Sequence, residues 1–140
     1  MWPTAEPDLF VRDEALRTDP QQVRSLWQSP DRRVVAVYKG HVDVNADVDI
    51  DPDDLILLGT VEGVPWFAAR SRTPDTVDLR AVADSLDPEE RSAALTAVAL
   101  DNWHAGHECC PRCGGRTRMV RAGWVRECVE DGSEHFPRTD

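Results

Sequence analysis

A closely spaced pair of cysteines near the C-terminus constrains the fold more than any other feature of this sequence. Cys110-Pro-Arg-Cys113 is followed by two glycines, and fourteen residues separate Cys113 from Cys128. Two thiolates three residues apart, with glycine behind them, form a tight turn that directs both sulfurs toward one tetrahedral ion. The spacing therefore predicts a zinc ribbon in which Cys110, Cys113 and Cys128 are metal ligands.

The residues between the cysteines predict the hairpin that a ribbon needs. Thr117–Val120 and Trp124–Arg126 read as strands, and Arg121-Ala122-Gly123 reads as the turn between them. We expect these strands to bring Cys128 back to the first two thiolates.

The fourth ligand is less regular. The position three residues after Cys128 holds Asp131, and Gly132 behind it permits a second turn. Zinc accepts carboxylate oxygen, so three thiolates with Asp131 make a chemically sound site. Alternatives for the fourth position are His135, Cys109 and His107. A ribbon that has lost its metal and is stabilised by packing also remains open.

The preceding part of the chain predicts an α+β domain with a small mixed sheet and helices. Arg33–Tyr38 is β-branched and ends at a turn, while Leu55–Val61 and Val64–Ala69 flank Glu62-Gly63, a hairpin signal. Proline cannot donate a backbone hydrogen bond. Pro65 therefore places its strand at a sheet edge or delays the start of that strand.

One long helix is predicted from Asp87, which is followed by Pro88 in the first turn, to about Gly106. Its regularly spaced apolar residues are expected to form the buried face: Ala94, Leu95, Val98, Ala99 and Trp103. His104 and His107 lie near its C-terminal end, where a surface histidine is favoured by the helix dipole.

The charge distribution bears on possible partners. The net charge is −10, but residues 109–140 contain six Arg against five acidic residues, which leaves −11 on residues 1–108. Such an acidic body opposes binding to nucleic-acid backbones.

The N-terminus lacks signal-peptide features, and no apolar run approaches the roughly 20 residues that span a bilayer. We therefore expect a cytoplasmic protein with no membrane segment, whose reduced thiols favour metal over disulfides.

Further residues accompany the cysteines in a recognisable order: Trp103-His104, His107, Thr117, Gly123–Arg126 and His135–Asp140. Together they resemble the ribbon of the NADH pyrophosphatases of the Nudix superfamily. Leu58–Thr60 and Val64–Ala68 give the preceding part a weaker similarity to the same proteins. The resemblance implies a Nudix-like N-terminal domain over residues 1–105. It also implies a zinc-ribbon module over residues 106–140 that leads into a catalytic Nudix domain.

The function implied by the resemblance is hydrolysis of the pyrophosphate of NADH or NAD to the mononucleotide and AMP, with NAD-capped RNA ends as further substrates. The family's catalytic helix collects carboxylates around Mg²⁺ or Mn²⁺. Glu89-Glu90-Arg91 is the only paired-acid segment expected on a helix, and it lacks the glycine loop and Arg-Glu of that motif. The chain is therefore expected to be a non-catalytic portion, inactive alone, of an enzyme that is a homodimer when full-length.

Two further expectations follow. In the family, the aromatic residue before the proline of the His135–Asp140 stretch lines the nucleotide-base pocket. The resemblance therefore points to Phe136 as a substrate-binding residue, with simple packing as the alternative.

A rival function is a stand-alone zinc-ribbon adaptor that binds nucleic acid or protein through the five arginines of residues 112–126. The acidic body and the presence of only one aromatic residue, Trp124, among these arginines oppose it.

Overall fold

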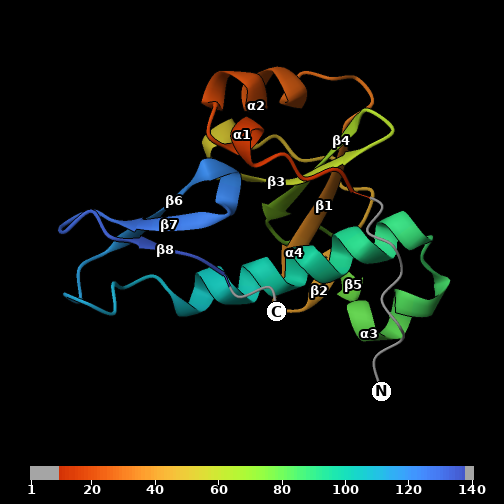
Figure 1. The fold of residues 1–140 in the computed structure, drawn as a ribbon. Coiled ribbons are helices and arrows are strands. Elements are labelled where there is room, and N and C mark those ends of the chain that lie inside the picture. Colours follow the sequence, from red (N-terminus) through yellow and green to blue (C-terminus); the bar gives the residue numbers. More distant parts are fainter. Residues whose placement is uncertain (1–9, 138–140) are drawn as a thin grey trace.

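The computed structural model describes residues 10–137 (Figure 1). The helices are α1 (Glu14–Arg17), α2 (Pro20–Trp27), α3 (Leu79–Val82) and α4 (Pro88–Gly106), with 3-10 turns η1 (Pro52–Asp54), η2 (Ala83–Ser85) and η3 (Arg121–Gly123). The strands are β1 (Arg33–Tyr38), β2 (His41–Asp43), β3 (Leu55–Val61), β4 (Val64–Arg70), β5 (Val77–Asp78), β6 (Thr117–Val120), β7 (Val125–Cys128) and β8 (Glu134–His135). The N-terminal stretch tested for a signal peptide and the final Arg138–Asp140 of the resemblance lie outside the described residues.

The larger sheet has five strands in the order β3-β4-β1-β2-β5. β1 and β4 are parallel, whereas the other neighbouring pairs are antiparallel. The predicted α+β class with a small mixed sheet is therefore confirmed. The two strands of the predicted hairpin, β3 and β4, pair with each other as expected.

Helices cover both faces of this sheet, because successive side chains of each inner strand point to opposite sides. On one side Val35, Ile56 and Trp66 pack with the alanines of α4. On the other side Val34, Leu57 and Phe67 pack with Val23 and Trp27 of α2. Figure 1 shows α4 crossing one face, with α1 and α2 lying on the opposite side.

The edge position suggested by Pro65 is wrong, because β4 lies between β3 and β1. Pro65 pairs with Thr60 of β3, but pairing with β1 begins only at the next residue, Trp66, opposite Arg33. The missing N–H of Pro65 therefore interrupts no bond to β1. The second alternative, a delayed start, holds only for the pairing with β1, because β4 itself begins at Val64 and pairs with β3 from there.

Helix α4 begins as predicted, with the backbone N–H of Asp87 donating to the Glu90 carboxylate at 3.1 Å. Its predicted buried face is only partly right. The residues buried against the sheet are Ala93, Ala94, Ala97 and Leu100, and His104 is buried further along the helix, against the ribbon. Leu95 is 45% exposed, and Trp103 is half-buried. Three alanines allow the helix to approach the sheet closely, so the larger apolar side chains lie at its flank instead.

The C-terminal part forms a three-stranded antiparallel sheet in the order β6-β7-β8, with the predicted turn at η3. This module packs against the outer edge of the large sheet: the Trp124 indole N–H donates to the carbonyl of Leu57 in β3 at 2.7 Å. The boundary between residues 105 and 106 stays a prediction, and α4 ends at Gly106. No helix within residues 10–137 is long and apolar enough to cross a membrane.

Candidate metal centre and adjoining groove

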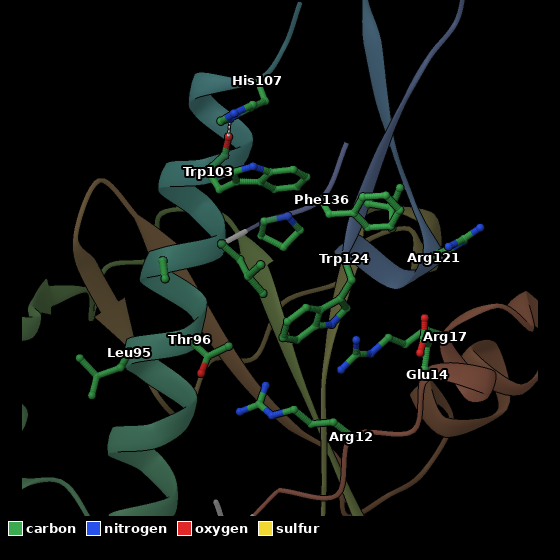
Figure 2. Close-up of a pocket in the computed structure, with 14 residues that line it drawn as sticks. Arg12, Glu14, Arg17, Leu95, Thr96, Trp103, His107, Arg121, Trp124 and Phe136 are labelled. Carbon is green, nitrogen blue, oxygen red and sulfur yellow. Dashed lines mark hydrogen bonds between the residues drawn. The ribbon is translucent and has the colours of Figure 1, made fainter. Parts of the chain in front are cut away.

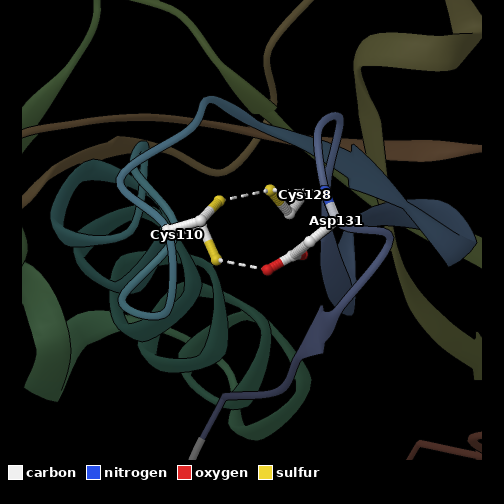
Figure 3. A group of neighbouring side chains, drawn as sticks. Cys110, Cys128 and Asp131 are labelled. Atoms are coloured by element: carbon white, nitrogen blue, oxygen red, sulfur yellow. Dashed lines mark hydrogen bonds between the residues drawn. The ribbon is translucent and has the colours of Figure 1, made fainter.

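Four side chains from two turns of the ribbon converge (Figure 3). Cys110, Cys113, Cys128 and Asp131 place one ligand atom each within 4.8 Å of all the others. The sulfurs of Cys113 and Cys128 are 3.5 Å apart, and the Cys110 sulfur lies 3.7 Å from a carboxylate oxygen of Asp131. A tetrahedron with ligands about 2.0–2.3 Å from a central ion has edges of roughly 3.3–3.8 Å. The donor set and these two spacings therefore fit zinc.

Both turns also direct backbone N–H groups at the sulfurs, as expected for a pair of zinc knuckles. These contacts distribute the negative charge of a thiolate over several dipoles and fix the direction of its lone pairs. The donors are Arg112 to Cys110 and Gly115 to Cys113 in the first knuckle, and Glu130 and Asp131 to Cys128 in the second, at 3.4–3.5 Å. The second knuckle thus has the same construction although its last residue is an aspartate.

Ser133 organises the aspartate side of the site and was missed by sequence reasoning. Its hydroxyl and backbone N–H donate to the Asp131 carboxylate at 2.6 and 2.8 Å and hold the pKa of that carboxyl well below its usual range. The same hydroxyl lies 3.4 Å from the Cys110 sulfur and is the main reason that the pKa of this thiol falls to about 6. A serine two residues after an aspartate is a common turn pattern and could have indicated this role.

Cys113 behaves differently from Cys110. The N–H of Gly115 lowers its pKa, but the neighbouring thiol of Cys128 and burial together raise it to about 11. A dication at this position favours the thiolate strongly, so metal binding is coupled to proton release from the cluster.

The competing fourth ligands lie outside the four-membered group. His135 is on β8, with its Nε2 3.5 Å from the Cys110 sulfur and 3.0 Å from the Ser133 hydroxyl. Cys109 is exposed, and its backbone pairs with Arg116 in an isolated bridge. His107 lies near the Trp103 carbonyl, with its Nδ1 at 2.7 Å. The geometry favours Asp131, and its assignment as a ligand stays a prediction.

We expect Asp131→Ala to lower the zinc affinity at least about tenfold, since a ligand is lost, and Asp131→Cys to raise it. His135→Ala should leave the affinity nearly unchanged, because in this geometry the imidazole contacts a ligand rather than the ion. Competition titration with a chromophoric chelator measures all three affinities. A His135 variant that loses its metal while the Asp131 variant retains it would reverse the assignment.

His104 is not the surface residue that its position near a helix end suggested. Its side chain is fully buried between α4 and the ribbon. Its Nε2 lies 2.8 Å from the carbonyl of Gly123 and its Nδ1 lies 3.0 Å from Nη1 of Arg126. Burial lowers the pKa of His104 to about 4, so the ring is neutral, donates from Nε2 and accepts at Nδ1. The spacing from Ala97 and Leu100 places His104 on their face of the helix, so it would have indicated burial once that face was known to be the buried one.

Beside the ribbon lies an open groove of about 1010 Å³ between α4, the hairpin and the N-terminal segment (Figure 2). Its walls include three aromatic residues and three arginines: Trp103, Trp124, Phe136, Arg12, Arg17 and Arg121. Phe136 is 59% exposed, so its ring is available to a ligand. The structure thus places the predicted substrate-binding residue at a groove, but its contact with substrate stays a prediction.

Comparison with known families gives two consecutive matches. Residues 9–103 match the NADH pyrophosphatase-like rudimentary NUDIX domain, and residues 107–136 match the NADH pyrophosphatase zinc ribbon domain. The chain belongs to the NADH pyrophosphatase family. Within this family the chain has a zinc-ribbon domain whose cysteine cluster supports zinc binding.

Curated relatives of this NADH pyrophosphatase family member are longer proteins. The NAD-capped RNA hydrolase NudC of Mycobacterium tuberculosis strain H37Rv is 30% identical over 148 residues, which cover 92% of this chain and 47% of the relative. The human mitochondrial NAD(P)H pyrophosphatase NUDT13 is 32% identical over 62 residues, 44% of this chain and 18% of the relative. The chain therefore spans about half the length of the mycobacterial protein that it matches.

Proposed function

We propose that this chain is the non-catalytic N-terminal and zinc-ribbon portion of an NAD(H) diphosphatase. The observation that supports this most directly is the pair of consecutive family matches over residues 9–103 and 107–136, in a chain that spans 47% of a relative named as a hydrolase. The whole enzyme would cleave the pyrophosphate of NADH or NAD, and of NAD-capped RNA ends, in the cytoplasm. Mg²⁺ or Mn²⁺ would be held by its catalytic domain.

In this proposal the N-terminal domain fixes the position of the ribbon, and the ribbon presents one wall of a base pocket. Zinc, when bound, joins the two knuckles and has a structural role. The Trp124 indole and His104 fix the ribbon against β3 and α4, so that the strand leading to Phe136 has a defined direction. The exposed ring of Phe136 would stack against the nicotinamide or adenine base. We also propose, on the family resemblance alone, that the full-length enzyme is a homodimer.

The rival adaptor function is not favoured by the relatives. The arginines proposed for it are also largely engaged within the module. Arg126 is buried and donates to Thr117, while Arg118 and Arg121 form ion pairs with Glu127 and Glu134 at 2.9 and 3.0 Å. These contacts leave less positive surface for a polyanion than the sequence suggested.

We expect the 140-residue chain to hydrolyse neither NADH nor NAD in the presence of Mg²⁺ or Mn²⁺, because its sequence contains no Nudix carboxylate helix. Chromatography of NADH after prolonged incubation measures the mononucleotide and AMP. Turnover that persists through repurification and is lost on a substitution in this chain would contradict the proposal. The reading frame beyond Asp140 provides a second check, since the proposal requires a Nudix motif there.

A further inference from the structure

Three arginines line the groove, and two of them gather at Trp124. Arg12 and Arg17 from the N-terminal segment and Arg121 from the hairpin line it, together with one acid, Glu14. Arg121 is ion-paired with Glu134. The other two guanidinium groups gather at the ring of Trp124, with their central carbons 5.5 and 3.9 Å from the ring centroid for Arg12 and Arg17. Figure 2 shows Arg17 extending toward the indole of Trp124 and Arg12 lying beneath it, with Phe136 above.

Arg17 is the notable member of this pair. Its guanidinium stacks over the indole but has no hydrogen-bond acceptor or ion-pair partner among residues 10–137. Burial and the charge of Arg12 both lower its pKa, and they outweigh the opposite effect of Glu14, one turn away on α1. Stacking uses the face of a guanidinium and leaves the N–H donors of its edge available.

An anion bound in the groove would stabilise the two arginines in two ways. It would accept hydrogen bonds from the edge of Arg17 and offset the repulsion between Arg17 and Arg12. Phosphate matches the fork of a guanidinium in a bidentate manner. The groove is also lined by Trp103, Leu95 and Phe136, which offer aromatic and apolar surface to a flat ring.

We propose that this groove binds a nucleotide, with the phosphate on Arg17, which is held in place by Trp124, and the base against the aromatic wall. The inference rests on the proposed function, because it extends the base pocket of Phe136 by a phosphate contact. The shared ligand chemistry is a flat base joined to a phosphate. That phosphate belongs either to the dinucleotide or to the nucleotide that follows in an RNA chain.

The test compares AMP with adenosine as ligands of the zinc-loaded 140-residue chain, by NMR titration of the tryptophan indole signals. AMP should bind about tenfold or more tightly than adenosine, the effect of one charge-assisted bidentate contact. Arg17→Gln should remove this difference, and Arg17→Lys should retain part of it. Arg24→Gln is the matched control, because Arg24 is exposed on α2 and paired with Asp53 away from the groove.

The outcomes separate this inference from the proposed function. Phe136→Leu should weaken AMP and adenosine alike. If it does while Arg17→Gln keeps the preference for AMP, the base pocket stands and the phosphate contact is overturned. If Arg17→Gln removes the preference while Phe136→Leu changes nothing, the phosphate contact stands without the base pocket. Equal affinity of the unchanged chain for both ligands overturns the inference.

The source of the phosphate is decided by two further ligands. An equal loss of affinity for AMP and for NAD in Arg17→Gln assigns the site to the dinucleotide. A loss confined to AMP and a short single-stranded RNA assigns it to the RNA chain. Either result supports the phosphate contact, and unchanged affinity for all of these ligands contradicts it.

Discussion

Cys110→Ser should deprive the chain of its zinc and unfold the ribbon, whereas Cys109→Ser should change neither. The two cysteines are neighbours in sequence but differ in placement. Cys110 is buried in the four-membered cluster, and Cys109 is exposed outside it. Losing one thiolate should lower zinc affinity about 100-fold. Structural zinc contributes on the order of 10 kcal/mol to the folding of isolated zinc-finger modules.

Elemental analysis and thermal melting measure this contrast. The unchanged chain and Cys109→Ser should each hold one zinc and melt at a lower temperature once a chelator is added. Cys110→Ser should hold much less zinc and show little further change with chelator. If the unchanged chain melts at the same temperature with and without chelator, the ribbon is stabilised by its packing alone.

Gly123→Ala should destabilise the chain by about 3 kcal/mol, although it adds a single methyl group. Gly123 has a φ of 90° and faces β3 at the joint between ribbon and sheet. An added Cβ would lie 2.5 Å from Cγ1 and 2.9 Å from Cβ of Ile56, a residue with no exposed surface. Because the neighbour is buried and branched, it cannot move aside without disturbing the core.

Gly63→Ala is the matched control, because Gly63 has a similar φ of 80° but no atom within 4 Å of an added Cβ. It should cost only the strain of the positive φ, about 1 kcal/mol. Denaturant unfolding gives both free energies of unfolding. Equal losses in the two variants would show that the ribbon can shift away from β3 without cost.

Much of the fold could be predicted from sequence because the signals are local. The strands Arg33–Tyr38 and Leu55–Val61, the start of α4 at Asp87 and the ribbon hairpin all depend on alternation, capping and turn residues within a few positions of each other. The candidate metal cluster has the same origin. Its cysteines are close in sequence and are joined by one hairpin, so their convergence requires no knowledge of the rest of the chain.

Residue spacing could not determine which flank of a helix meets the sheet. On α4, Leu95 and Trp103 are more apolar than Ala93 and Ala97, but the alanines face the sheet, because close approach of helix and strands favours small side chains. The position of Pro65 on an inner strand was open for a similar reason, since the order of strands is set by packing between distant segments.

The groove, too, was decided only by the tertiary structure. The sequence alone was enough to predict a zinc ribbon with three cysteines and a second turn at Asp131, with the aromatic residue Phe136 close behind. Arg17 and Trp124 are more than a hundred residues apart, and nothing local to either indicates that a guanidinium will stack on the indole. They meet because Trp124 donates to Leu57 at the open edge of β3, which fixes the ribbon beside the N-terminal segment. A contact between distant segments depends on the free energy of the whole fold, which local sequence patterns do not contain.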